Sequence, residues 1–212
     1  MLTAAVMTTS SGRDELWKCI EAVQNQSYRA KHYILTDGII SFEEFCALRE
    51  RIVGMGYDNI GTVEMLLGAD GSFNFLEMNT RLQVEHGVTE EVTGVDLVKA
   101  QIRSAAGERL ADILPAKIEV KGHAIQARVY AEDPKNFFPS PGKLNVFRPP
   151  LDKSVRVETG FAEGRDVTPH YDPMIAKVIV HADTRGAAID TLIAALEAFE
   201  IQGLKHNIPA VL

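Results

Sequence analysis

Cysteine is scarce in this sequence, which has only Cys19 and Cys46 among its 212 residues. Two cysteines cannot build the disulfide framework that stabilises small secreted domains, so their scarcity favours a reducing, cytoplasmic setting. No apolar run approaches the ~20 residues that a transmembrane helix needs. Residues 1–11 also lack the basic flank and the long apolar core of a signal peptide. These absences predict a cytoplasmic protein that does not enter a membrane.

Basic residues are outnumbered, because 22 Lys and Arg face 29 Asp and Glu and the formal net charge is −7. This balance argues against nucleic-acid binding through a basic surface, although it leaves room for a local anion site. The six histidines are scattered without the spacing of metal ligands, so we predict no zinc site. Apolar residues make up 46% of the chain, enough for the core of one large domain or two small ones.

Hydrophobic periodicity predicts a mixed α+β fold with an antiparallel sheet. The predicted strands lie at 4–8, 33–36 and 59–67, and the predicted helices lie at 14–25, 42–53, 95–106 and 187–199. Thr184 has the residue type of an N-cap for the last helix, and Gly107 and Gly203 are expected to end the last two helices.

The segment Phe75–His86 carries a polar residue at every second position, namely Glu77, Asn79, Arg81, Gln83 and Glu85. Side chains alternate between the two faces of a strand, so an extended backbone would place these groups on one face. A solvated strand face gives the same alternation and is the alternative interpretation.

A hairpin is predicted just upstream, because Asp70-Gly71 between apolar runs is a strong turn signal. A two-residue turn there places Glu64 opposite Glu77, with their Cβ atoms about 5 Å apart. The same register forms two apolar pairs, Met65 with Leu76 and Val63 with Met78. Two carboxylates at that distance repel by roughly 3 kcal/mol at an effective dielectric of ~20, and a cation would remove this cost. Oxygen ligands suit Mg²⁺ or Mn²⁺. The alternatives are a protonated carboxyl or a slipped register.

These strands belong to a longer series of motifs: Gly61–Glu64, Phe75–His86, Val88–Leu97, Gly122–Pro134, Phe138–Lys143, His170–Lys177 and Gly203–Ile208. In this order the motifs resemble biotin carboxylase, the ATP-grasp component of acetyl-CoA, propionyl-CoA, pyruvate and related carboxylases. The resemblance runs from about Phe42 to the C-terminus. It implies a partial ATP-grasp domain at 41–110, followed by the C-terminal domain of that family at 111–212. The implied reaction is ATP-dependent carboxylation of carrier-bound biotin with bicarbonate, through carboxyphosphate.

The resemblance also implies roles for individual residues. Glu64 and Glu77 match the carboxylates that bind Mg²⁺ or Mn²⁺ against the ATP phosphates, and Asn79 assists them. The bicarbonate cradle is implied at Arg81, Gln83 and Val84. Glu85 matches the general base that deprotonates bicarbonate.

Arg128 matches the cation that stabilises the enolate form of biotin. It alternates with apolar neighbours between Ala124 and Tyr130, so it is expected on one face of a strand. Without the resemblance, a structural arginine paired with an acid would be the better interpretation. Asp172 is a further candidate that could instead serve packing or subunit contacts.

Residues 1–40 resemble something else, the opening β-α-β segment of a family 2 glycosyltransferase, in which an acid such as Asp37 contacts a nucleotide. The Asp-x-Asp metal motif of that family is absent, which argues against glycosyl transfer. The glycine-rich phosphate loop of an ATP-grasp lid is also missing. We therefore expect the chain to be inactive alone. A lid supplied by another chain and a non-catalytic dimerisation module are the alternatives.

The resemblance implies a biotin carboxyl carrier protein or domain as partner and a homodimer as a possible assembly. At one position the sequence departs from the family, because Gly87 follows His86 where proline is usual. We expect this glycine to loosen the loop after Glu85, by up to about 1 kcal/mol in chain entropy.

Overall fold

The computed structural model describes residues 3–8, 34–35, 54, 60–67 and 73–212, and it describes the backbone alone for 3–8, 34–35, 63–67 and 73–76. The chain divides into two compact units. The first unit is Met1–His86 with Val95–Ile118, and the second is Gly87–Gly94 with Glu119–Leu212. None of the described helices has the length and apolar character needed to cross a bilayer.

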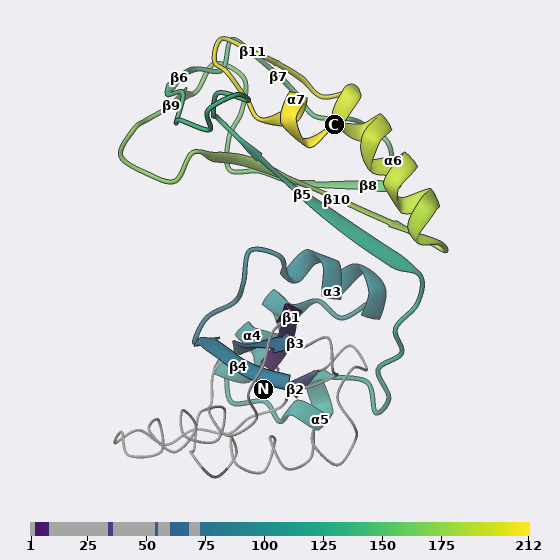
Figure 1. Ribbon diagram of the computed structural model, residues 1–212. Helices are drawn as coiled ribbons and strands as arrows, with labels where there is room; N and C mark the ends of the chain where they lie inside the picture. Colours follow the sequence, from purple (N-terminus) through teal and green to yellow (C-terminus); the bar gives the residue numbers. More distant parts are fainter. Residues whose placement is uncertain (1–2, 9–33, 36–53, 55–59, 68–72) are drawn as a thin grey trace. The chain divides into compact units, whose positions relative to one another are not determined.

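The first unit holds a four-stranded sheet in the order β2-β1-β3-β4 (Figure 1). Its elements are β1 (Thr3–Thr8), β2 (Ile34–Leu35), β3 (Gly61–Leu67), β4 (Phe73–Asn79), α4 (Leu97–Ala105) and α5 (Leu110–Ile113). Strand β1 is parallel to both β2 and β3, whereas β3 and β4 are antiparallel, so this sheet is mixed. The predicted strands at 4–8 and 33–36 are confirmed, the second as a two-residue strand. The predicted helices at 14–25 and 42–53, and Asp37, lie outside the described residues.

The β3–β4 hairpin has the predicted register only in part. Glu64 pairs with Glu77, and Val63 pairs with Met78, as expected. Beyond Glu64 the register shifts, so that Met65 pairs with Phe75 rather than with Leu76. An extra residue on one strand of an antiparallel pair bends that strand and shifts the register. The predicted turn at 70–71 lies outside the described residues.

The strand predicted from Phe75 to His86 ends at Asn79, and this part of the prediction is wrong. A turn at Val84 and Glu85 leads into helix α3 (His86–Thr93). The polar alternation therefore continues past the end of the strand without an extended backbone to support it. The expectation of a loosened loop at Gly87 is also wrong, because this residue is buried in the first turn of α3.

Helix α4 confirms the predicted helix at 95–106. Its N-cap is Asp96, whose side chain accepts a hydrogen bond of 2.7 Å from the backbone N–H of Lys99. Such a cap satisfies one of the unpaired N–H groups at a helix start. Gly107 follows the helix with φ +90°, a conformation that favours glycine.

The second unit is built on the antiparallel sheet β5-β10-β8. Its elements are β5 (His123–Tyr130), β6 (Gly142–Lys143), β7 (Val146–Arg148), β8 (Val155–Glu158), β9 (Asp166–Val167), β10 (Met174–Ala182), α6 (Arg185–Glu197), β11 (Glu200–Gln202) and α7 (Ile208–Val211), together with most of α3. Two small antiparallel pairs, β11-β7 and β6-β9, complete it. The predicted α+β class with an antiparallel sheet is confirmed.

Helix α6 begins where the sequence predicted. Thr184 is its N-cap, with the side-chain oxygen accepting from the N–H of Ala187 at 3.2 Å. The helix is not ended by Gly203, however, because β11 intervenes between them. Gly203 instead has φ +108°, and a Cβ there would lie 2.1 Å from the carbonyl oxygen of Lys143.

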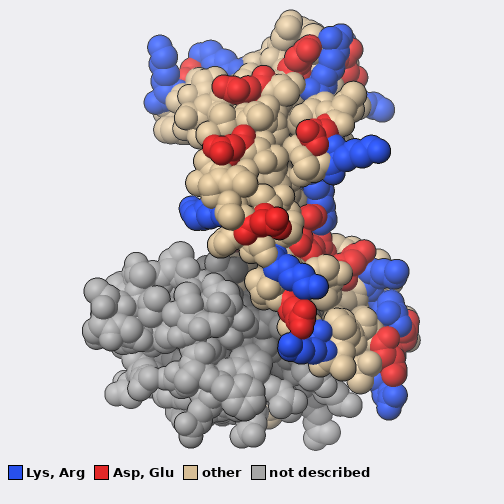
Figure 2. Space-filling model, turned by 90° about the vertical axis from the view of Figure 1, so that its right-hand side faces the viewer, with Lys and Arg blue, Asp and Glu red and all other residues tan. Residues whose placement is uncertain are grey.

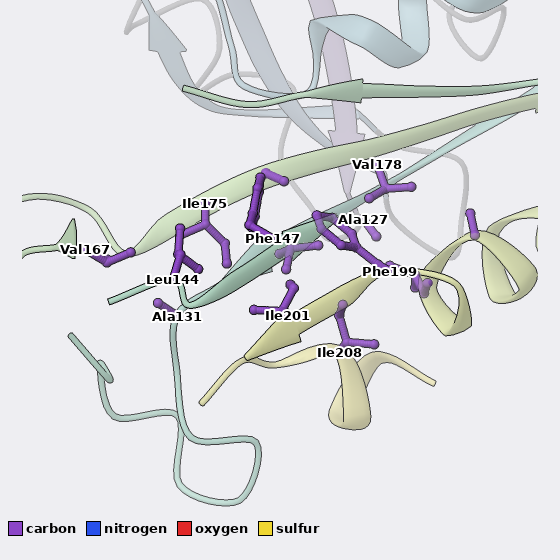
Figure 3. Packing of buried hydrophobic residues seen from close by; sticks show 14 residues of the cluster. Ala127, Ala131, Leu144, Phe147, Val167, Ile175, Val178, Phe199, Ile201 and Ile208 are labelled. Atoms are coloured by element: carbon purple, nitrogen blue, oxygen red, sulfur yellow. The ribbon is translucent and has the colours of Figure 1, made fainter. Parts of the chain in front are cut away.

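The main core lies in the second unit, between its sheet and α6 (Figure 3). Val129 and Val178 face into it from β5 and β10, and Phe147 packs edge-on against Phe199 with ring centroids 5.2 Å apart. Residues that alternate with these valines point to the opposite sheet face, where the charged groups described below lie. A smaller cluster of Ile60, Val95 and Leu97 belongs to the first unit.

Candidate functional site

The first part of the site is the carboxylate pair of the hairpin. Glu64 on β3 and Glu77 on β4 are direct partners in the register of the hairpin, so the two positions share one face of the sheet. The Glu77 side chain is exposed, whereas the Glu64 side chain lies outside the described part of the structure. The strand register alone therefore places Glu64 opposite Glu77, as the sequence predicted.

Hydrogen bonds continue from Glu77 along the chain. The Asn79 amide donates from Nδ2 to Oε1 of Glu77 at 2.8 Å. Arg81 in turn donates from its guanidinium to Oδ1 of Asn79 at 3.2 Å. The same guanidinium reaches the carbonyl oxygen of Leu82 at 3.4 Å. Glu77, Asn79 and Arg81 therefore form one connected polar row that ends in an exposed cation.

This donor set fits a hard divalent cation. Two carboxylates and an amide oxygen are ligands that Mg²⁺ and Mn²⁺ accept, usually together with substrate phosphates. Among the described side chains there is no group of three or more His, Cys, Asp or Glu close enough to hold a metal. A cation here would therefore use the Glu64–Glu77 pair with oxygen atoms from a bound substrate.

Gln83, Val84 and Glu85 do not continue the polar strand face. They lie in the irregular segment and turn that precede α3, and the carbonyl of Gln83 accepts from the N–H of His86 at 3.3 Å. Gln83 is buried, while Val84 and Glu85 are half-buried. These residues follow Arg81 in the chain through a bend and a turn rather than along an extended strand.

Arg128 lies on β5 in the second unit, half-buried, and alternates with the buried Ala127 and Val129 as predicted. In the register of the sheet it is paired with Lys177 of β10, which is paired in turn with Glu158 of β8. Lys177 is 9% exposed and donates to Oε2 of Glu158 at 2.5 Å. The row across the sheet therefore consists of two neighbouring cations followed by one acid.

An ion-pair network that the sequence did not predict fixes α3 on this sheet. Arg156 of β8 contacts Glu90 at 2.6 Å and Glu91 at 3.2 Å, both on α3, and also binds Glu158. The Glu90 side chain is 7% exposed. Figure 2 shows basic and acidic side chains intermixed over the described residues on the face drawn.

The electrostatics of the network favour its charged form. Burial opposes ionisation of Glu158, but hydrogen bonds from Lys177 and Arg156 outweigh it and hold the pKa of Glu158 below its ordinary value. Burial likewise opposes the charge of Arg156, but the three acids outweigh it and raise the pKa of Arg156. Both shifts favour the charged forms of Glu158 and Arg156 at neutral pH.

Asp172 has a local role. Its carboxylate accepts from the N–H of Met174 at 2.8 Å, which shapes the turn before β10. This contact is typical of an Asx turn. No described contact links Asp172 with the other candidate residues.

Two families match this sequence. The Biotin carboxylase C-terminal domain matches residues 126–212, and the Carbamoyl-phosphate synthase L chain, ATP binding domain, matches residues 41–113. A biotin carboxylase of Halalkalibacterium halodurans is 53% identical over 171 residues, 77% of this chain and 38% of that protein. The propionyl-CoA carboxylase alpha chain of Ruegeria pomeroyi is 46% identical and covers 73% of this chain, with 26% of its own length matched.

A solved structure is similar as well. The biotin carboxylase domain of Hydrogenobacter thermophilus 2-oxoglutarate carboxylase has a TM-score of 0.72 and 42% identity, over 81% of this chain and 39% of that one. This chain carries a partial biotin carboxylase domain. The Hydrogenobacter biotin carboxylase was solved as a domain dimer with MgADP, ADP and bicarbonate. This chain spans only about two fifths of such biotin carboxylase domains, with 39% of that neighbour matched.

Proposed function

We propose that this chain supplies the metal-, bicarbonate- and biotin-contacting part of a biotin carboxylase. The proposed reaction carboxylates biotin on a carrier protein or domain, using ATP and bicarbonate through carboxyphosphate. The observation that carries the proposal is the hairpin, in which Glu64 and Glu77 are partners and Asn79 and Arg81 extend the polar row.

The residues divide the work by their chemistry. Arg81 presents a planar fork that binds carboxylate-like anions, and Gln83 and the backbone at Val84 complete the bicarbonate cradle. Glu85 removes the bicarbonate proton, which converts that oxygen into a nucleophile toward the γ-phosphate of ATP. Arg128 places a positive charge beside an anionic oxygen of the biotin substrate.

Glu64 and Glu77, with Asn79, would hold Mg²⁺ or Mn²⁺. When bound, the metal neutralises charge on the phosphates during phosphoryl transfer. The connected row from Glu77 to Arg81 would keep the metal ligands and the bicarbonate ligand in a fixed relation.

Calorimetry tests the metal and nucleotide site directly. Mg·ATP is titrated into the chain and into the double variant Glu64→Gln/Glu77→Gln, with Glu197→Gln as a control for loss of a surface carboxylate. Glu197 is exposed on α6 in the second unit. We expect binding in the low micromolar to millimolar range that the double variant loses and the control keeps. No heat at millimolar Mg·ATP would refute a working metal–nucleotide site in this chain and favour an assembly module.

A further inference from the structure

Asn207 makes three hydrogen bonds with one short stretch of β5. Its side-chain Oδ1 accepts from the N–H of Tyr130 at 2.9 Å, and its Nδ2 donates to the carbonyl of Arg128 at 3.0 Å. Its own backbone N–H donates to the carbonyl of Tyr130 at 3.1 Å. Asn207 is 9% exposed, so water does not readily replace these bonds.

The contact occurs at the open edge of the sheet. In the order β5-β10-β8, strand β5 pairs with β10 on one side only. The N–H and C=O groups on its other side need partners, as on any edge strand. The carboxamide of Asn207 presents an N–H donor and a C=O acceptor side by side, as a peptide group of a neighbouring strand would, and it satisfies the two edge groups that flank Val129. These groups belong to Arg128 and Tyr130.

Few other side chains can replace this carboxamide. Aspartate is nearly isosteric, but its ionised carboxylate has no donor for the carbonyl of Arg128. Serine is too short to contact both groups at once. The bond set therefore depends on an amide at position 207.

We propose that Asn207 is a positioning residue, which fixes the backbone of β5 at Arg128 and so the place from which its guanidinium projects. This inference rests on the role of Arg128 stated under the proposed function. A displacement of about 1 Å at a reacting group can cost about 100-fold in rate. An unsupported edge strand at Arg128 would permit displacements of that kind.

The test uses Asn207→Asp in the full chain, with Asn136→Asp as a matched control. At Asn136 the side chain accepts a hydrogen bond from the N–H of Phe138 at 3.0 Å, which aspartate also does. The first measurement is the rate of amide hydrogen exchange of Tyr130 in the variant, divided by its rate in the original chain at the same pH. The second follows the Arg128 guanidinium signals in the nitrogen–proton spectrum while free biotin is added.

We expect Tyr130 to exchange at least 10-fold faster in Asn207→Asp near neutral pH, with shifted Arg128 signals and weaker biotin binding. As the pH falls, the carboxyl group of the new aspartate gains a proton and can again donate a hydrogen bond. The exchange ratio of Tyr130 should then return toward one. The control should show neither effect. Ratios are taken at each pH because titratable groups surround the site, namely Arg128, Tyr130, Asp133, Lys205 and His206.

Unchanged Tyr130 exchange and unchanged Arg128 signals in Asn207→Asp would overturn the proposal, as would a change that does not reverse at low pH. Asn207→Ser, which adds no charge, supplies the same neutral-pH comparison if the aspartate variant does not fold. Absence of biotin binding in the original chain would refute the proposed role of Arg128 here. The positioning by Asn207 would still be decided by the exchange ratio and the Arg128 signals.

Discussion

Replacing Arg156 by methionine should destabilise the second unit markedly. The change keeps most of the apolar stem and removes the guanidinium that binds Glu90, Glu91 and Glu158. Glu158 keeps Lys177 as a partner, but the buried carboxylate of Glu90 loses its 2.6 Å contact. The main cost is therefore the loss of an ion-pair contact by a carboxylate whose side chain is only 7% exposed.

The magnitude follows from burial. Removing one partner of a fully buried ion pair costs about 3–5 kcal/mol. The Arg156 side chain is 34% exposed, so water partly replaces the missing guanidinium in the variant. The expected loss in the free energy of unfolding therefore falls to about 2–3 kcal/mol. Arg109→Met is the matched control, because Arg109 is 80% exposed in its pair with Asp112. Loss of an exposed pair should cost less than about 1 kcal/mol.

Urea unfolding followed through the amide signals of β8 and β10 measures this loss in the unit concerned. Adding Glu90→Gln to Arg156→Met removes the buried carboxylate that faced the guanidinium and should recover about 1–2 kcal/mol. The lowered pKa of Glu158 means that its stabilisation is present at neutral pH and is lost as the pH falls through its folded-state pKa. The difference between the original chain and Arg156→Met should therefore narrow in acid. A loss below about 0.5 kcal/mol at neutral pH, or no coupling with Glu90, would refute the reasoning.

Three further outcomes are expected. Gly203→Ala should lower the free energy of unfolding in urea by at least about 2 kcal/mol, because it combines positive φ with a Cβ placed 2.1 Å from the Lys143 carbonyl oxygen. An unchanged midpoint of urea unfolding would contradict the close contact. Gly87→Ala should destabilise the original chain, because the added Cβ would lie 2.4 Å from Cδ1 of Ile179. In an Ile179→Val background, which lacks that atom, the same substitution should stabilise the chain by about 0.5–1 kcal/mol. A change of the same sign in both backgrounds would argue against overpacking. Burial lowers the pKa of His206, so the fold favours its neutral form, and stability should fall as the pH drops below the ordinary pKa of 6.5. His206→Gln should flatten the slope of stability against pH between pH 7.5 and 5.5. An identical slope in the variant would exclude His206 as its source.

The sequence predicted the parts of the fold that depend on neighbouring residues. The N-cap at Thr184 depends on a few neighbouring positions and was predicted correctly, and the predicted pairing of Glu64 with Glu77 is observed as well. The register shift after Glu64 was not predictable, because a bulge leaves the alternation of residue types almost unchanged. The end of the strand at Asn79 was missed for a similar reason, since polar residues in a turn can continue an alternating pattern by coincidence.

The network around Arg156 could not be predicted from local pattern either. Arg156 and Glu90 are 66 positions apart, and only the packing of α3 on the sheet brings them together. A signal was nevertheless present, because Arg156 and Glu158 alternate on a strand whose other residues are valines. Charges on a half-buried strand face require partners, so that alternation indicated an ion pair without naming its members.

Paramagnetic broadening by Mn²⁺ in the presence of ATP tests the central claim most directly. The account predicts that Mn²⁺ broadens the amide signals of Glu77, Asn79 and Arg81 at substoichiometric metal and that Glu77→Gln removes this broadening. Broadening that is absent from this row, or that persists unchanged in Glu77→Gln, would contradict a metal site on the hairpin.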